Sequence, residues 1–261
     1  MNSVRFDREE GGGLLLAIDT SGPLCAAGLY DGPVERARIV LDLGRGHAER
    51  VIDACTDALR AGDAGWGDVA RIAVTVGPGS FTGIRAGVAA ARGLALSLGV
   101  PAIGVTTLEA MDGPPLNPYA VALDARRGQL YAQAFGAGGD ALSEPMVDAP
   151  DALARRLPSG VASIVGSGAP ALVAAMEAAG RDARVGERDG RSLTDAQPDI
   201  AAVASHAVRA GELAGRGGRP PVPLYLRGAD AKLPGGIEPG PATGAASGNA
   251  MPPPASSARI A

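Results

Sequence analysis

A glycine-rich loop, GPGSFTG at residues 77–83, joins an apolar run at Val69–Val76 to a nearly uncharged segment at Ile84–Leu98. The apolar run has the composition of a buried strand, and the segment after the loop has the length and composition of a helix. Val100–Val105 is a second apolar run that follows the predicted helix directly. A strand, a helix and a second strand in this order form a parallel crossover, which predicts an α/β fold.

Three more apolar runs precede this crossover, at Leu14–Asp19, Cys25–Tyr30 and Val34–Leu43. Short turn sequences that contain Gly separate them, so they are predicted to form antiparallel strands. The segment His47–Arg60 then carries apolar residues every three or four positions, the pattern of an amphipathic helix. Residues 14–111 are therefore predicted to form one lobe.

The segment DGPPLNP at residues 112–118 predicts a hinge, because Pro and Gly disfavour both helix and central strand. A second lobe is predicted over residues 112–232. Its predicted strands are residues 119–123, 129–135, 144–147 and 162–165, and its predicted helices are residues 151–157, 170–179 and 199–214. These elements repeat the plan of the first lobe as a pattern, without a residue-level repeat. The last helix, 199–214, can pack back on the first lobe.

The two ends of the chain differ in composition from the rest. Residues 1–13 are charged and Gly-rich, and residues 233–261 are rich in Gly, Pro, Ala and Ser, so both are predicted to be disordered. Between them the cores must be built from Ala, Val, Leu and Ile, because 46% of residues are hydrophobic but only 3% are aromatic. No apolar run approaches the roughly 20 residues that a membrane span needs. We therefore expect a soluble, cytoplasmic protein without a membrane partner.

Cysteine usage and charge exclude two further classes of protein. Cys25 and Cys55 are the only cysteines, too few for a disulfide framework in a chain of 261 residues. With 24 basic and 28 acidic residues the formal net charge is -4, which argues against a polyanion as a partner of the chain by itself. We expect the isolated chain to bind tRNA weakly and without sequence preference.

The loop at residues 77–83 has two interpretations. A strand, a glycine-rich turn and a helix together point backbone N–H groups and a positive helix end at one spot, which is an anion-binding geometry. It is not a Walker loop, because no Lys-Ser or Lys-Thr follows the glycines, and Pro78 and Thr82 stand where a nucleophile elbow centred on Ser80 needs Gly. The other interpretation, a tight turn whose glycines adopt positive φ, is favoured on the motif alone.

Five segments, in this order and spacing, resemble the TsaB (YeaZ) family of bacterial proteins: LAIDTSGPLCAAGLYDG, GHAERVIDAC, VGPGSFTGIRAGVAAARGLA, LDARRGQLYAQAF and PLYLRGADAK. The resemblance spans about residue 14 to residue 232, and GPGSFTGIR is highly specific to the family. It implies an α/β fold of the actin, sugar-kinase and Hsp70 type, with two ribonuclease-H-like lobes whose mixed sheets are flanked by helices.

The resemblance also implies a function in making N6-threonylcarbamoyladenosine at position 37 of tRNAs that read ANN codons. In this family the protein is a non-catalytic subunit that pairs with and activates TsaD, the paralogue that carries the metal, nucleotide and transferase chemistry. The small ATPase TsaE docks on the pair. Transfer RNA is then contacted only through the complex, and ATP or ADP, if bound at all, lies at the complex interface. No cofactor is expected in this subunit alone, and a homodimer of the isolated chain is left open.

A catalytic site of the chain's own has little support from its residues. A kinase-like site needs carboxylates for Mg²⁺ and glycine-rich loops from both lobes. Asp19-Thr20-Ser21 lies where a fold of this type keeps its first phosphate loop, and GSGAP at residues 166–170 is a candidate to face it. We favour a turn-capping role for Asp19 over magnesium binding. A vestigial phosphate loop would consist of Asp19, Thr20, Ser21, Gly77, Gly79, Ser80, Thr82 and Gly83.

The histidines do not predict a metal site. The metal of the catalytic paralogue is held by two histidines four residues apart on one helix face, whereas His47 is followed at that spacing by Val51. His206 lies in a different predicted helix, and a single His gives no chelate. We predict that His47 flanks the start of its helix and that His206 lies on a half-exposed helix face. No catalytic residue and no metal ligand is predicted.

The helix Ile84–Leu98 has almost no polar face, which leaves two alternatives open: a fully buried helix, or one that covers the sheet with one side and meets a partner with the other. Since TsaB-like proteins pair with TsaD through the helices of their first lobe, the resemblance favours the second. The predicted interface consists of Ala48, Val51, Ile52, Cys55, Arg85, Ala86, Gly87, Ala89, Ala90 and Gly93. The rival hypotheses are an independent actin-fold ATPase or small-molecule kinase, and a purely regulatory homodimer.

Overall fold

The first sheet is built around a strand that is covered on both faces. In the computed structural model, which describes residues 13–111, 117–189, 191–213 and 220–227, β1 (Leu14–Asp19) is the central strand of the order β3-β2-β1-β4-β5. Its continuous apolar sequence, LLLAID, is typical of such a position. The other strands are β2 (Leu24–Asp31), β3 (Val34–Asp42), β4 (Val69–Thr75) and β5 (Ala102–Val105).

Strand direction in this sheet follows from the connections. The neighbours β1, β2 and β3 are joined by short turns and are antiparallel, whereas β4 and β5, which are reached through helices, run parallel to β1. The register places Ile18 opposite Ala27 on one side and opposite Val74 on the other. This is the predicted combination of an antiparallel meander and a parallel crossover.

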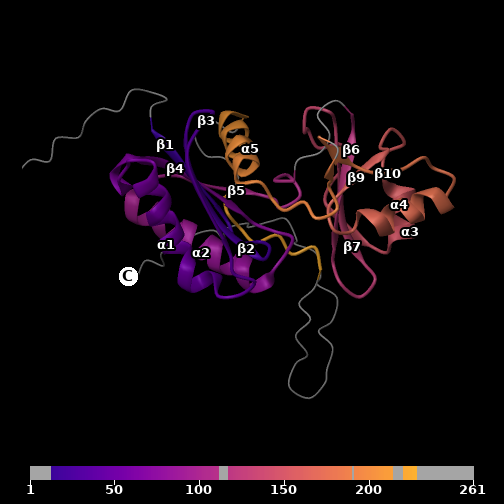
Figure 1. Cartoon of the computed structure of the whole chain (residues 1–261), viewed down its shortest axis with the longest axis horizontal. Helices are drawn as coiled ribbons and strands as arrows, with labels where there is room; N and C mark the ends of the chain where they lie inside the picture. Colours follow the sequence, from indigo (N-terminus) through magenta and orange to yellow (C-terminus); the bar gives the residue numbers. More distant parts are fainter. Residues whose placement is uncertain (1–12, 112–116, 190, 214–219, 228–261) are drawn as a thin grey trace, which may run out of the picture. The chain divides into compact units, whose positions relative to one another are not determined.

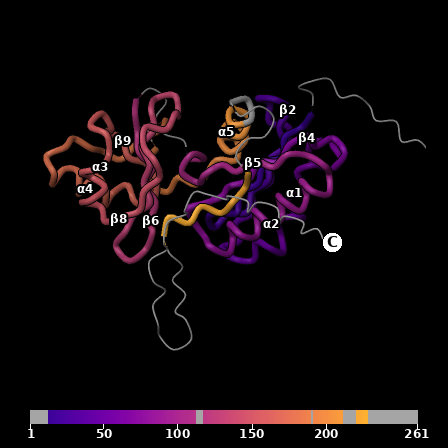
Figure 2. The backbone as a smooth tube through the Cα atoms, turned by 180° about the vertical axis from the view of Figure 1, so that it is seen from behind, coloured from indigo at the N-terminus to yellow at the C-terminus, as the bar shows by residue number. Residues whose placement is uncertain are grey.

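Helices cover the two faces of the first sheet separately. The helices α1 (His47–Ala61) and α2 (Phe81–Leu98) lie on one face, and α5 (Ile200–Leu213) lies on the other (Figures 1 and 2). Alternate residues of β1 divide between them, because Leu16 and Ile18 pack with α1 and α2 while Leu15 and Ala17 pack with α5. A single 3₁₀ turn, η1 (Trp66–Asp68), precedes β4.

The helix α2 begins three residues before the predicted start. The side chain of Ser80 accepts a hydrogen bond from the backbone N–H of Gly83 at 3.2 Å, so Ser80 is the N-cap and the helix begins at Phe81. The helix ends at Gly99, whose φ of 68° is the left-handed conformation that glycine adopts most readily.

A second sheet repeats the topology of the first. Its order is β10-β9-β6-β7-β8, in which β6, β7 and β8 are antiparallel neighbours and β9 and β10 run parallel to β6. The strands are β6 (Tyr119–Asp124), β7 (Leu130–Phe135), β8 (Met146–Asp148), β9 (Ser163–Val165) and β10 (Arg184–Val185). The helices α3 (Pro150–Arg156) and α4 (Ala169–Ala178) pack on this sheet. Two mixed five-stranded sheets of the same order, flanked by helices, confirm the predicted fold class.

Some short elements were not predicted. The strand β10 and the hairpin of β11 (Glu187–Arg188) and β12 (Arg191–Ser192) contain two residues per strand, too few to show a periodic pattern. Residues 224–226 form no strand, although the backbone N–H of Leu224 donates to Val76 O at 2.7 Å. The predicted disordered ends and most of the predicted hinge at 112–118 lie outside the described residues.

The segment that follows β5 contacts both sheets. Thr106 and Glu109 form a reciprocal cap, in which each side chain accepts a hydrogen bond from the other's backbone N–H at 3.0 and 2.7 Å. Within this turn and just after it, Leu108 and Met111 are fully buried in a cluster with residues of the second sheet, whereas Ala110 packs with α5. This turn therefore links the two cores.

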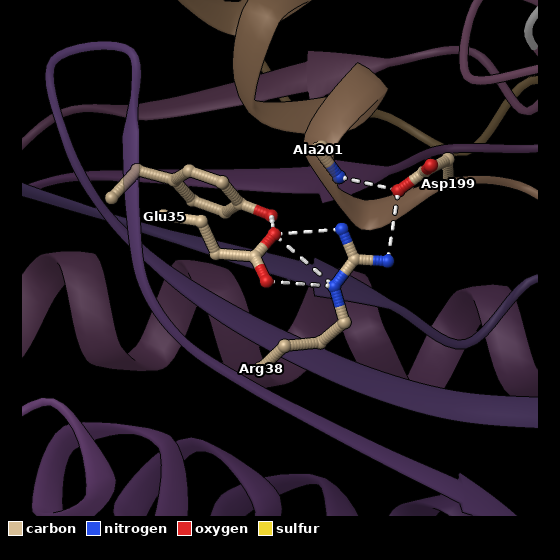
Figure 3. Close-up of polar contacts among 5 residues, drawn as sticks. Glu35, Arg38, Asp199 and Ala201 are labelled. Carbon is tan, nitrogen blue, oxygen red and sulfur yellow. Dashed lines mark hydrogen bonds and ion pairs between the residues drawn. The ribbon is translucent and has the colours of Figure 1, made fainter.

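A polar network holds the start of α5 against the edge strand β3 (Figure 3). The Arg38 guanidinium donates to Glu35 Oε2 at 2.7 Å and pairs with Asp199 Oδ1 at 3.2 Å. The Tyr30 hydroxyl donates to Glu35 Oε2 at 2.8 Å, and Asp199 accepts from the backbone N–H of Ala201. These hydrogen bonds, above all those from Arg38, lower the pKa of Glu35, and burial raises the pKa of Tyr30.

The network predicts a pH-dependent part of the stability. Because the folded pKa of Glu35 lies below its unfolded value of about 4.3, its contribution is present above that pH and is lost as the pH falls through the folded pKa. Glu35→Gln should therefore lower the free energy of unfolding at pH 7 by at most about 1 kcal/mol, since the pair is partly exposed, and the deficit should vanish in acid. Urea unfolding at pH 7 and at pH 3 measures this. Glu144→Gln, at an exposed glutamate in the connection between β7 and β8, is the control, and a deficit that persists at pH 3 would contradict the prediction.

Candidate functional site

The turn after β1 packs directly against the start of α2. The backbone N–H of Ser80 donates to Ser21 O at 2.7 Å, and the Thr20 hydroxyl donates to Gly83 O at 2.7 Å. A Cβ atom at Gly83 would lie 2.1 Å from Thr20 O, and one at Gly79 would lie 2.3 Å from Ser21 O. The structure thus brings the predicted phosphate-loop residues together. Glycine is required at positions 79 and 83 because the backbone of the β1 turn lies where a side chain would be.

Asp19 has its hydrogen bonds within its own chain. The side chain is buried, and Oδ1 accepts from Thr75 Oγ1 at 2.6 Å, from Ser21 Oγ at 2.7 Å and from Ser21 N at 3.0 Å. Burial raises the pKa of this carboxyl, although the bonds from Thr75 and Ser21 and the nearby His47 oppose the increase. A side chain that bonds to the backbone N–H two residues later closes an Asx turn. This geometry fits a turn-capping role better than magnesium binding.

The remaining loop residues also serve the turn. Gly77 has a φ of 101°, a conformation that residues with a Cβ rarely adopt, and its Cα lies against Ile84 and the carbonyl oxygen of Leu224. The Ser80 hydroxyl is used as the helix cap, and Thr82 is exposed in the first turn of α2. The loop therefore has the geometry of a tight strand-to-helix turn.

A hollow of about 640 Å³ lies beside this turn, lined by Ser21, Ser80, Thr107, Asp124, Arg126 and Ser167 among others. It brings the loop of the first sheet near the predicted GSGAP segment of the second. Among the residues that the structure describes, Asp124 is the one carboxylate that lines the hollow, and Asp19 is buried outside it. In GSGAP, Gly166 and Gly168 pack against the backbone of Ala122. A magnesium ion bound with a nucleotide in this hollow would have one carboxylate ligand from its lining. A kinase-like site instead needs carboxylates for Mg²⁺ together with glycine-rich loops from both lobes.

The two histidines lie on different helices. His47 is the first residue of α1, buried, with Nε2 lacking a hydrogen-bond partner, and His206 is half-buried on α5 near Arg209. Within residues 13–111, 117–189, 191–213 and 220–227, no group of three or more His, Cys, Asp or Glu side chains could hold a metal ion.

The two cysteines are free thiols in the core of the first sheet. Cys25 lies on β2 and Cys55 on α1, and burial raises the pKa of Cys55 to about 12. Such a thiol is protonated at neutral pH and is a poor nucleophile or metal ligand.

Seven of the ten residues in the predicted interface reach the surface of α1 and α2. The exposed ones are Ala48, Ile52, Arg85, Ala89 and Gly93, and the half-buried ones are Ala86 and Ala90. The prediction is wrong for Val51, Cys55 and Gly87, which are buried against the sheet. A Cβ at Gly87 would lie 2.3 Å from Thr20 Oγ1, so this glycine allows the β1 turn to approach α2 and cannot face a partner.

Sequence reasoning missed the most exposed apolar residue of this surface. Leu96 is 86% exposed on α2, and it follows Arg85, Ala89 and Arg92 along one stripe of the helix. Spacings of four, seven and eleven residues from Arg85 would have identified that stripe. We call the exposed surface of α1 and α2, which includes Ala48, Ile52, Arg85, Ala89, Arg92, Gly93 and Leu96, the paired-helix face.

The family to which the chain belongs follows from a comparison with family models. Residues 42–180, more than half of the chain, match the model described as TsaD: tRNA N6-adenosine threonylcarbamoyltransferase. The chain belongs to this family. Curated relatives confirm the resemblance to TsaB (YeaZ) within it. The Escherichia coli and Bacillus subtilis proteins named tRNA threonylcarbamoyladenosine biosynthesis protein TsaB are 35% and 37% identical over 122 and 120 residues, which is 45% of this chain and 52% of each relative.

An uncharacterized protein of Mycobacterium tuberculosis is 38% identical over 120 residues, 45% of this chain and 56% of that protein. The chain thus spans about half the length of the curated relatives it matches. Among solved structures, YeaZ from Pseudomonas aeruginosa has a TM-score of 0.65 at 23% identity and covers 82% of this chain and 100% of its own. A second Pseudomonas aeruginosa structure, described as similar to peptidase YEAZ, has a TM-score of 0.66 at 24% identity. These likenesses support the fold.

The burial of Gly87 predicts a contrast between two glycines of α2. Gly87→Ala should destabilise the protein by about 1–3 kcal/mol, because Thr20 is buried and hydrogen-bonded and cannot move away from the added methyl group. Gly93→Ala should be neutral or stabilising by up to about 1 kcal/mol, because nothing lies near its Cβ position and Ala favours a helix. Thermal melting followed by circular dichroism checks both. Equal melting temperatures for the two variants would show that α2 is rotated differently.

Proposed function

We propose that this chain is a non-catalytic subunit of the complex that makes N6-threonylcarbamoyladenosine in tRNA, and that it acts by pairing with and activating a TsaD-like paralogue. The family membership and the names of its TsaB relatives, which are tRNA threonylcarbamoyladenosine biosynthesis proteins, support this process. The observation that carries the role is the paired-helix face, where Ile52, Ala89, Gly93 and Leu96 are exposed and Leu96, at 86%, is the most exposed of the large apolar residues that the structure describes. Exposed apolar residues rimmed by charges are typical of a protein interface.

The rest of the complex is proposed from the family. A TsaE-like ATPase docks on the pair, tRNA is bound by the complex and not by this chain alone, and ATP or ADP, where it binds, lies at the interface. The compartment is the cytoplasm, where tRNA is modified. None of the described helices is long and apolar enough to cross a membrane.

The small residues of the paired-helix face fit contact with another helix. Ala89 and Gly93 lie one turn apart on α2, and Ala48 lies on the neighbouring α1, so a partner backbone can approach closely at these positions. Contact of this kind depends on dispersion forces over a closely matched surface. A bulky charged side chain at its centre would both hold the helices apart and bury an unpaired charge.

The interface predicts a variant that folds but does not pair. Ala89→Glu should weaken binding to the TsaD paralogue of the same genome by at least about 100-fold, because a longer charged side chain at the centre of the contact holds the two helices apart and must be desolvated, at a cost of several kcal/mol, while a micromolar complex is worth about 8 kcal/mol. The monomer should remain folded, since Ala89 is exposed. Calorimetric titration and circular dichroism are the measurements. Ala174→Glu on α4 of the second sheet is the matched control, with an exposed helical alanine replaced in the same way. Undiminished binding by Ala89→Glu would place the interface elsewhere.

The rival function, an independent ATPase or small-molecule kinase, would use the hollow beside the β1 turn. Its lining includes hydroxyl groups from both sheets, which favours a polar ligand. Against this function stand the internal hydrogen bonds of Asp19 and the close contact between the turn and α2. The carboxylate that a metal would need already accepts hydrogen bonds from Thr75 and Ser21.

The two functions predict opposite results with nucleotide. Calorimetric titration of the isolated chain with Mg-ATP should give no stoichiometric isotherm in the micromolar range, because Asp124 is the one described carboxylate that lines the hollow and Asp19 is engaged in internal hydrogen bonds. The TsaD paralogue under the same conditions is the positive control. A one-to-one isotherm that is lost in Asp19→Asn would favour the kinase-like function.

A further inference from the structure

An arginine at the start of α2 lies over one exposed aromatic ring and is hydrogen-bonded to a second, neighbouring ring. The guanidinium carbon of Arg85 lies 3.9 Å from the ring centroid of Phe81, and its Nε donates to the Tyr225 hydroxyl at 3.0 Å. The rings of Phe81 and Tyr225 are 5.6 Å apart, and 47% and 51% of these two residues is exposed. We call these three residues the arginine stack. Its contacts fix the position of the guanidinium without neutralising its charge.

Tyr225 belongs to a segment that is itself firmly placed. This C-terminal strap, residues 220–227, crosses β5 and β4 before it reaches α2. A Cβ at Gly104 would lie 3.1 Å from Pro221 Cα, and the backbone N–H of Leu224 donates to Val76 O at 2.7 Å. Leu224 also packs against the core that α1 and α2 share. The strap thus brings a tyrosine 140 residues away in sequence to Arg85.

The charge on α2 has no counterpart in the part of the chain that the structure describes. The helix has no acidic residue, and no described carboxylate forms an ion pair with Arg85 or Arg92. The two arginines are seven residues apart and exposed on the same stripe, about 10 Å along the helix axis. Between and beyond them lie Ala89 and Leu96, both exposed.

We propose that the arginine stack and Arg92 form a carboxylate-recognition stripe that docks an acidic, apolar helix of the protein partner. The proposal rests on the function proposed above and adds the chemistry of the partner surface. The partner helix would carry two carboxylates about two turns apart, with apolar residues between them that meet Ala89 and Leu96. Tyr225 acts as a positioning residue, because it holds Arg85 and lies beside the partner helix without needing to pair with it.

A protein partner fits this face better than a nucleic acid. The adjacent helix α1 exposes Glu49, Asp53 and Asp57, which would repel a continuous row of phosphates. A partner helix pair can instead place carboxylates opposite α2 and cations opposite α1. The exposed Leu96 has no favourable role against a phosphate backbone, whereas it can be buried in a protein interface.

The experiment compares reversal of the two arginine charges on α2 with loss of the Tyr225 hydroxyl group that positions Arg85. Binding of the full chain to the TsaD paralogue of the same genome is measured by calorimetry for Arg85→Glu/Arg92→Glu, for Tyr225→Phe and for Arg155→Glu. Arg155→Glu is the matched control, because Arg155 is an exposed arginine on a helix of the second sheet. The double reversal should weaken binding by at least about 100-fold, Tyr225→Phe by about 3- to 10-fold, and the control by less than about twofold.

The salt dependence of binding provides a second readout. The dissociation constant of the wild-type pair should rise with salt, and the slope should be smaller for Arg85→Gln/Arg92→Gln, which also stays informative if the reversed variant fails to fold. A folded charge-reversed or neutral variant with unchanged affinity for the paralogue overturns the proposal. So does a variant that keeps the paralogue but loses tRNA binding by the complex, which would assign the stripe to phosphate.

Failure of this proposal can be separated from failure of the proposed function. If Ala89→Glu abolishes pairing while the arginine variants bind normally, the interface stands and the stripe has no role in it. If Ala89→Glu and the arginine variants all bind normally, the paired-helix face is not the interface and the stripe proposal falls, while the pairing itself stands. If the wild-type chain does not bind the paralogue at all, the proposed function falls.

Discussion

The close approach of the β1 turn to the backbone of α2 determines which surface the first sheet presents. The carbonyl oxygen of Thr20 leaves no room for a side chain at position 83, and its hydroxyl leaves none at position 87. These two contacts fix the rotation of α2 about its axis, so that Ile84, Val88, Ala91 and Ala95 enter the core. The stripe from Arg85 to Leu96 then necessarily faces outward. A shift of the turn by one ångström would change both the core and the surface, because packed interiors have little free volume.

The sequence was sufficient for most of the fold and for only part of the surface. The uninterrupted apolar run LLLAID and the regular apolar spacing of α1 left little doubt about their structure, because buried strands and amphipathic helices have distinct periods. The helix α2 is different, since small apolar residues occur on all its sides and composition does not separate inside from outside. Gly87 was assigned to the wrong side, although its spacing of three from Ile84 and four from Ala91 places it on the buried face.

Contacts between segments that are distant in the sequence could not be predicted from local sequence patterns. Nothing near Arg85 indicates Tyr225, which reaches it only because the strap crosses two strands of the first sheet. Similarly, the pairing of Arg38 with Asp199 depends on α5 returning to the first sheet after the whole second sheet has been formed. In both cases the local sequence around each residue predicts only a solvent-exposed charge or an aromatic residue in a loop. Their partners are set by topology, which single-sequence periodicity does not encode.

The strap has a consequence for the order of events during synthesis. Because Tyr225 completes the arginine stack, the surface around α2 is unfinished until the last described segment of the chain has left the ribosome. The strands and helices of residues 14–105 are synthesised earlier, but one face of their sheet is covered only when α5 has been added. A chain that has formed α5 but lacks the strap would therefore have a covered first sheet and an Arg85 without its tyrosine partner. The strap therefore couples the position of a charge on α2 to the segment that is synthesised last among the described residues.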